Sequence, residues 1–476
     1  PLDLDYRPQA VHDPATGGLS LSYGYDPVGS ITELKNGAGA EVLAKYAYDT
    51  LGRLAQTQDG ATGTPIETYG YDATGNRISL TTSAGTASYI YPATSHLLTA
   101  VDGEVRNHDT AGNTTSIGSK SFTYNDANRM SAVKQGNTTL ESYGYNHRGE
   151  RVLRTPASGA AQITLYDEAG QWLGNYTATG QAEQQAIWLD NYPVALMNVP
   201  STGVPELAYI QPDHLGTPRV VIDPVRDVAI WEWSSKSEAF GDQSPADDPD
   251  GDGVPFKLTL RYPGQQATDA SGLFYNYHRE YEPNVGRYSQ SDPIGVSGGI
   301  NTYLYAGAGP VARVDPLGLD YLVIGGGVRE GSLNFFGHVG IAISDNGMYS
   351  YGNDTPLGSS PLEYLRSQSE YRNQTVVLVP ATPQQSLASV QYLSRTYPGM
   401  NSVGFFDNCA VRSNEGLMAG GMSTLQIPFP GGMTRAASRM PGARTFYIPK
   451  GGDIPRELLD ALPSYESKAA MSGGDR

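Results

Sequence analysis

Short runs in which aromatic or aliphatic positions alternate with polar ones fill the first 180 residues. A period of two is typical of half-buried β-strands. Most runs end in one motif, an aromatic residue, Asp or Asn, two variable residues and Gly, whose glycine suits the positive φ of a turn. Because a hairpin cannot bury its face alone, the hairpins are expected to stack into one sheet. The motif recurs at Tyr25, Tyr48, Tyr71, His108, Tyr124, Tyr145 and Tyr166.

Beyond residue 319 the repeat stops, and the pattern becomes that of an α+β domain. The helix that begins after Thr382 has the clearest signals, with Thr382 as N-cap, Pro383 at the first position and Gln385 completing a capping box. A later helix is predicted to begin near Cys409, behind Asp407 and Asn408. Strands are predicted at 321–326, twice within 335–353 around a D-N-G turn, at 374–380 and at 444–449, and a further helix at 361–371.

Composition and charge narrow the functional classes. A single cysteine among 476 residues excludes an internal disulfide. The net charge is −17, nearly all of it before residue 320, and no basic stripe exists for phosphate binding. Nucleic acid is therefore not an expected partner. The sequence has no signal peptide and no apolar run of about 18 residues, and because it starts at Pro1 without Met we expect a piece of something longer.

The repeats resemble the YD repeats of Rhs proteins. DHLGTPR (213–219), the segment from RYPGQQ to SDPIG (261–295) and DPLGL (315–319) resemble the Rhs core segment. The resemblance implies a β-rich shell around a toxic C-terminal domain, although seven repeats are too few to enclose one. The implied domains are a YD-repeat shell over residues 1–211, a core segment with a self-cleaving junction over 212–319, and a toxin domain over 320–476.

Two Asp-Pro pairs mark the junction. The Rhs resemblance implies that Asp292 and Asp315 form an aspartyl autoprotease that cuts the bond between Leu319 and Asp320. Two carboxylates held together cannot both ionise, so one serves as acid and the other as base. Two ordinary Asp-Pro turns are the alternative. The nearby acidic turn 247–253 resembles the start of a calcium loop, but its twelfth position is Thr259 instead of Glu, so a solvated loop is expected.

Cys409 is the single cysteine, and His338 is the single histidine after residue 278. A thiol at a helix start beside an imidazole is activated as a nucleophile, whereas a lone cysteine can also be a small buried hydrophobe. The order of GHVGIAIS before DNCAVRSNEGL resembles circularly permuted papain-like hydrolases, which include permuted NlpC-type peptidases and lecithin–retinol acyltransferase-like enzymes. That resemblance implies an orienting residue at Tyr351. Strand parity also allows Asn353 if the turn has two or four residues, and a three-residue turn brings in Ser350 instead.

The predicted architecture is thus a β-rich YD-repeat shell segment followed by an α+β permuted papain-like domain. The predicted function is a toxin, released by self-cleavage, that hydrolyses an amide bond of peptidoglycan or of a target protein. A lipid acyl hydrolase or acyltransferase of the same fold and a non-enzymatic, Tyr-rich adhesion protein are the alternatives. A cognate immunity protein and a secretion-system carrier are implied partners, with delivery into a target cell. No cofactor is expected, because one Cys and one His cannot assemble a zinc site.

Overall fold

The computed structural model divides the chain into two compact units. Pro1–Ser291 with Tyr303–Pro316 form the first, here the shell unit, and Asp292–Thr302 with Leu317–Arg476 form the second, here the terminal unit. The residues that the structure describes are 8–26, 30–37, 41–167, 170–189, 192–200, 203–236, 239–293, 301–315, 320–326, 338–343, 347–350, 359–380, 437, 444–455 and 458.

The repeat motif forms a turn capped by its own Asp or Asn. In the third repeat the carboxylate of Asp72 accepts hydrogen bonds from the N–H groups of Thr74 (2.8 Å) and Asn76 (3.0 Å). Gly75 follows with φ 88°, a conformation that side chains with a Cβ rarely adopt, as predicted. The same pair of hydrogen bonds recurs at Asp49, Asp109, Asn125 and Asn146, and also at Asp213, where the sequence pattern had not indicated a repeat.

In the six motifs that begin with a tyrosine, its hydroxyl connects the turn to an earlier part of the chain. The Tyr71 hydroxyl donates to the carbonyl of Leu54 (2.9 Å), and the Tyr48 hydroxyl donates to that of Ile31 (2.8 Å). Burial raises the pKa of Tyr71 to about 12, so its hydroxyl remains a donor at neutral pH. Equivalent bonds start from the motif tyrosines of four other repeats, at Tyr25, Tyr124, Tyr145 and Tyr166.

The predicted single sheet is observed as a 22-stranded antiparallel meander in which each strand pairs with its neighbours in the chain. The sheet continues to Glu232, beyond the last recognised motif at Tyr166. The predicted boundary between residues 211 and 212 therefore lies within the sheet. The strands are β1 (Ala10–His12), β2 (Ser20–Tyr25), β3 (Ile31–Asn36), β4 (Glu41–Tyr48), β5 (Leu54–Asp59), β6 (Pro65–Tyr71), β7 (Arg77–Thr82), β8 (Gly85–Ile90), β9 (Ala100–Val101), β10 (Glu104–His108), β11 (Thr114–Ile117), β12 (Lys120–Tyr124), β13 (Met130–Gln135), β14 (Thr138–Tyr145), β15 (Arg151–Pro156), β16 (Gln162–Tyr166), β17 (Trp172–Thr177), β18 (Ala182–Leu189), β19 (Tyr192–Asn198), β20 (Glu206–Pro212), β21 (Pro218–Asp223) and β22 (Val228–Glu232).

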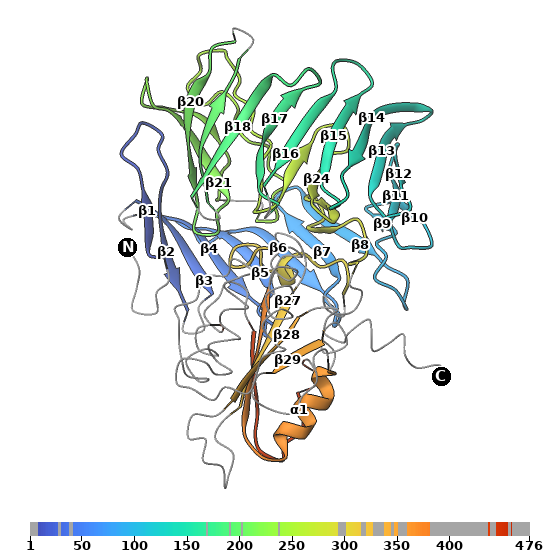
Figure 1. Ribbon diagram of the computed structural model, residues 1–476. Coiled ribbons are helices and arrows are strands. Elements are labelled where there is room, and N and C mark those ends of the chain that lie inside the picture. The colour runs from blue at the N-terminus through green and yellow to red at the C-terminus, as the bar shows by residue number, and fades with distance from the viewer. Residues whose placement is uncertain are drawn as a thin grey trace, which may run out of the picture. The chain divides into compact units, whose positions relative to one another are not determined.

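The two ends of the meander meet, so that the sheet curls back on itself (Figure 1). The N–H of Thr16, between β1 and β2, donates to the carbonyl of Asp227 (3.2 Å), and the N–H of Ala229 in β22 donates to the carbonyl of Thr16 (2.9 Å). The Gln211 side chain adds a second link, because it donates to the carboxylate of Asp13 (2.6 Å) and accepts from the N–H of Leu19 (2.5 Å). We call this contact the seam.

A second, four-stranded sheet fills the inside of the curled meander. It comprises β23 (Gln266–Thr268), β24 (Leu273–Asn276), β25 (Arg279–Glu282) and β26 (Arg287–Tyr288), and every residue of the last three strands is buried. Separate stretches of the meander pack on it: β12–β14 around Leu273, β8 around Val285, and β17–β22 around Tyr281 and Tyr288. We call residues 266–288 the plug.

The terminal unit contains a five-stranded antiparallel sheet in the order β29-β28-β27-β30-β31. Its elements are β27 (Asp320–Gly326), β28 (His338–Ile343), β29 (Gly347–Ser350), α1 (Pro361–Ser369), β30 (Gln374–Pro380) and β31 (Arg444–Ile448). Each matches a predicted element. Leu365 of α1 packs on one face with Ala342, Met348 and Val376. The predicted helices after Thr382 and near Cys409 lie outside the described residues. Among the helices that the structure describes, none is long and apolar enough to span a membrane.

Candidate functional site

The best-defined cluster of chemically competent groups in the shell unit surrounds Asp315. Two donors bind the same carboxylate oxygen, Oδ2: the Arg279 guanidinium at 3.1 Å and the Tyr288 hydroxyl at 3.0 Å. The Asn276 side-chain amide donates both to the backbone carbonyl of Asp315 (3.0 Å) and to the Tyr288 hydroxyl oxygen (2.6 Å). The guanidinium carbon of Arg279 lies 3.6 Å from the centre of the Tyr288 ring. Both the side chain and the backbone of Asp315 are therefore fixed by the plug.

Buried ion pairs hold the plug, and thus these donors, inside the meander. Arg106 of β10 contacts Glu282 at 2.6 Å, and Arg151 of β15 lies 3.6 Å from Glu280. The Tyr275 hydroxyl accepts a hydrogen bond from the N–H of Arg151 (2.9 Å). Removing one partner of the Arg106–Glu282 pair leaves an uncompensated buried charge, so this contact penalises displacement of the plug.

The junction segment, residues 303–315, is also tied to the shell. The Tyr303 hydroxyl donates to the carbonyl of Gly112 (2.8 Å), and Tyr305 is completely buried among the plug tyrosines. Asp315 is therefore the last described residue of a segment that is held by the shell unit. The next described residue in the sequence is Asp320, in the terminal unit.

The second predicted carboxylate belongs to the other unit. Asp292 is 7% exposed, and its backbone N–H donates to the carbonyl of Thr302 (2.8 Å). Asp292 is part of the terminal unit, and Asp315 is part of the shell unit. Leu319 lies outside the described residues, and Asp320 is the first residue of β27.

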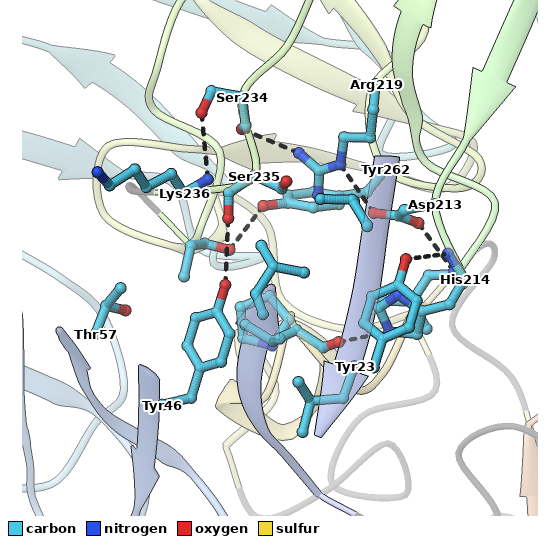
Figure 2. Close-up of a pocket in the computed structure, with 17 residues that line it drawn as sticks. Tyr23, Tyr46, Thr57, Asp213, His214, Arg219, Ser234, Ser235, Lys236 and Tyr262 are labelled. Carbon is cyan, nitrogen blue, oxygen red and sulfur yellow. Dashed lines mark hydrogen bonds and ion pairs between the residues drawn. The ribbon is translucent and has the colours of Figure 1, made fainter. Parts of the chain in front are cut away.

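A cavity of about 30 Å³ lies where the first repeats, the DHLGTPR turn and the junction segment meet (Figure 2). The Nε2 atom of His214 lies 3.0 Å from the carbonyl of Val311, so Nε2 carries the proton, because a carbonyl can only accept. Burial lowers the pKa of His214, which keeps its ring neutral. Burial raises the pKa of Asp213, but Arg219, at 2.8 Å, and His214 outweigh it, so that the pKa is lowered overall. The space suits about one ordered water and is too small for a substrate.

In the terminal unit, the structure gives the backbone position of His338 and the register next to it. His338 opens β28 and pairs with Gly326 of β27, as the predicted strand start required. Strand β28 pairs Ile343 with Gly347 and Gly340 with Ser350, so three residues separate the closing pair of this hairpin. The sequence pattern predicted Ser350 as the orienting residue for a turn of three residues, and the observed register has this length. Cys409, Tyr351 and Asn353 lie outside the described residues.

The acidic turn brings three carboxylates together. Ligand atoms of Asp248, Asp250 and Asp252 lie within 4.8 Å of one another. Arg226 contacts two of them, Asp250 at 2.6 Å and Asp252 at 2.8 Å. The guanidinium places a positive charge beside two of the carboxylates, but one oxygen each of Asp248 and Asp250 is buried, so the turn is less solvated than the sequence predicted.

The sequence analysis missed the three residues that hold Asp315. Asn276, Arg279 and Tyr288 all lie within the segment that resembles the Rhs core, but their spacing carries no motif for a carboxylate clamp. One signal was available in the sequence. Arg279 lies in a run rich in aromatic residues that also contains other Arg and Glu residues, and charged side chains in a buried aromatic segment are expected to pair.

Comparison with known proteins identifies the family of the larger part of the chain. The sequence model described as Teneurin YD-shell matches residues 15–298, more than half of the chain. The crystal structure of TcdB2-TccC3 superposes with a TM-score of 0.50 at 22% identity, over 66% of this chain and 18% of that one, which reports on fold alone.

Curated relatives match shorter stretches. Toxin protein Tse5 of Pseudomonas aeruginosa is 33% identical over 136 residues, which is 29% of this chain and 10% of that protein. Double-stranded DNA deaminase toxin A of Burkholderia cenocepacia is 42% identical over 110 residues, which is 22% of this chain and 7% of that protein. The chain thus spans a tenth or less of the length of these relatives.

Proposed function

The chain belongs to the Teneurin YD-shell family, and from this premise we propose that it is part of a delivered toxin whose shell cuts itself from the terminal unit after Leu319. The toxin names of its relatives Tse5 and the DNA deaminase toxin support the toxin class. The observation that carries self-cleavage is the clamp on Asp315, four residues before the proposed cut.

The proposed cut is a hydrolysis by two carboxyl groups, those of Asp292 and Asp315. The carboxylate that acts as base takes a proton from water, and the water oxygen attacks the carbonyl carbon of Leu319. The protonated partner gives its proton to the nitrogen of Asp320 as the C–N bond breaks. One water is consumed, and the products end at the Leu319 carboxyl group and begin at the Asp320 amine.

Self-cleavage is tested by following the full chain after cell-free synthesis. We expect the parent to yield pieces ending at Leu319 and starting at Asp320, identified by intact mass, whereas Asp292→Asn and Asp315→Asn each remain whole. Asp223→Asn is the matched control, because Asp223 also precedes a proline but lies in a surface turn against Arg226. A chain that stays uncut would falsify self-cleavage, and aspartate variants that cut at the parent rate would refute the role of these two carboxyl groups.

For the released part we propose a cysteine hydrolase that acts on an amide bond, with Cys409 as nucleophile and His338 as base. The sequence supports this role, because it has one cysteine and, after residue 278, one histidine, and that histidine opens β28. Lipid acyl transfer by the same residues is the second chemistry. The deaminase named for one relative is disfavoured, because zinc deaminases need two or three cysteine ligands and this chain has one.

The target compartment separates the possible substrates. Producing the full chain in the bacterial cytoplasm or exporting it to the periplasm is expected to arrest growth in one compartment only. Arrest in the periplasm supports the peptide part of peptidoglycan as substrate, and arrest in the cytoplasm supports a target protein. A secretion-system carrier and a cognate immunity protein complete the proposal, and co-expression of the immunity protein is expected to restore growth.

A further inference from the structure

Tyr288 occupies the centre of the contacts around Asp315. Its hydroxyl lies 3.0 Å from Asp315 Oδ2 and 2.6 Å from the Asn276 amide nitrogen, and its ring faces the Arg279 guanidinium. We propose that Tyr288 is a positioning residue that aims the Asp315 carboxylate for self-cleavage, an inference that rests on the proposed function.

The hydrogen-bond directions support this role. The Asn276 nitrogen can only donate, so the phenol oxygen accepts from it, and the single phenol proton points elsewhere. Of the two acceptors that Asp315 offers to this proton, the carboxylate Oδ2 at 3.0 Å is the stronger, since the Asp315 carbonyl is 3.4 Å away. Asn276 therefore sets the direction in which Tyr288 donates.

The clamp acts on one side of the carboxylate only. Arg279 and Tyr288 both bind Oδ2, and no residue in the described part of the chain donates to Oδ1. Among the described residues, Oδ1 is thus held at a fixed place without a donor of its own, which suits a group that exchanges a proton. Tyr288 and Asn276 are 1% and 2% exposed, so water does not compete with these bonds.

The plug provides a matched control for the hydroxyl. Tyr281 pairs with Tyr288 across β25 and β26, is 0% exposed, and donates its hydroxyl to the carbonyl of Phe240 at 2.7 Å. Tyr281→Phe therefore removes a buried, hydrogen-bonded hydroxyl from the same sheet without touching Asp315, whereas Tyr288→Phe removes a hydroxyl that donates to Asp315 and accepts from Asn276.

The test is a pulse of radiolabelled cell-free synthesis of the full chain, followed by dilution into buffers from pH 5 to pH 8. We expect Tyr288→Phe to slow the appearance of the cut products about tenfold or more, because it removes a hydrogen bond to a charged group. Tyr281→Phe is expected to cut at the parent rate. The acid limb of the rate profile is expected to move to higher pH in Tyr288→Phe alone, because a carboxylate that loses a donor binds protons more readily.

A second variant guards against misfolding. Asn276→Ala leaves the phenol in place but removes the group that directs its proton, and we expect a smaller slowing in a chain that tryptophan fluorescence shows to be folded. Parent-like rates and pH profiles for both Tyr288→Phe and Asn276→Ala would overturn the positioning role, while an inactive Asp315→Asn would leave self-cleavage standing. If Asp315→Asn also cuts normally, both proposals fail together.

Discussion

Glu280 offers the sharpest test of how the plug is held. The residue is 2% exposed, and one carboxylate oxygen, Oε2, has no hydrogen-bond partner among the described residues. Burial raises the pKa of Glu280 from 4.5 to about 7, with Arg151, Arg154 and Arg129 opposing the rise and Glu141 adding to it. Below pH 4.5 the carboxyl group is neutral in both folded and unfolded chains, so it carries no charge to be buried.

The direction of the pH effect follows from these two values. Between pH 4.5 and about 7 the unfolded chain releases the Glu280 proton while the folded chain retains it, so stability falls as pH rises. A difference of about 2.5 pKa units, from 4.5 to about 7, corresponds to about 3 kcal/mol. Glu280→Gln is neutral at every pH and keeps the shape, so it escapes this loss.

Tryptophan fluorescence during urea denaturation measures the free energy of unfolding of the shell unit, because all four tryptophans lie between residues 172 and 233. We expect the Glu280→Gln chain to gain about 3 kcal/mol relative to the parent between pH 4.5 and pH 8. The exposed Glu206 serves as control, since Glu206→Gln is expected to follow the parent. If parent and Glu280→Gln curves stay parallel across this range, Glu280 is not neutral in the fold and the reasoning is refuted.

Three further predictions concern other parts of the chain. Tyr71→Phe removes the bond to Leu54 and is expected to cost about 1 kcal/mol in urea denaturation, whereas Tyr209→Phe, 47% exposed, costs less than about 0.5 kcal/mol. Cys409→Ser and His338→Ala are each expected to abolish toxicity and, combined, to add nothing further, because nucleophile and base act as a unit; a folded, fully toxic Cys409→Ser chain contradicts the cysteine hydrolase. EDTA is expected to leave toxicity unchanged, and loss of toxicity that calcium restores would redirect attention to the acidic turn.

The repeat and its packing were readable from sequence because they are local. The period-two pattern and the Tyr-Asp-x-x-Gly motif encode strand, turn and side chain orientation within a few residues, and Asp72 and Gly75 adopt the predicted roles. The strands of the terminal unit and the start of β28 at His338 followed from the same kind of local signal.

Contacts between distant residues could not be read in this way. The clamp joins Asp315 to residues 27 to 39 positions earlier, and the Arg151–Glu280 pair spans 129 positions, so no periodicity encodes either. The Asp213 turn escaped notice because Pro212 stands where the other motifs have an aromatic residue, although its Asp and Gly are in place. The Rhs resemblance implied the two aspartates, but not the plug residues that hold one of them.

The seam has a consequence for the order in which the shell unit folds. Every other pairing in the meander joins neighbouring strands, which form within microseconds because only short loops must close. The contact between Thr16 and Val228 closes a loop of more than two hundred residues, whose entropy must be lost before any bond is gained. Ring closure is therefore expected as a late, slow step, and until it occurs the interior aromatic residues and both outer strands remain open to association with other chains.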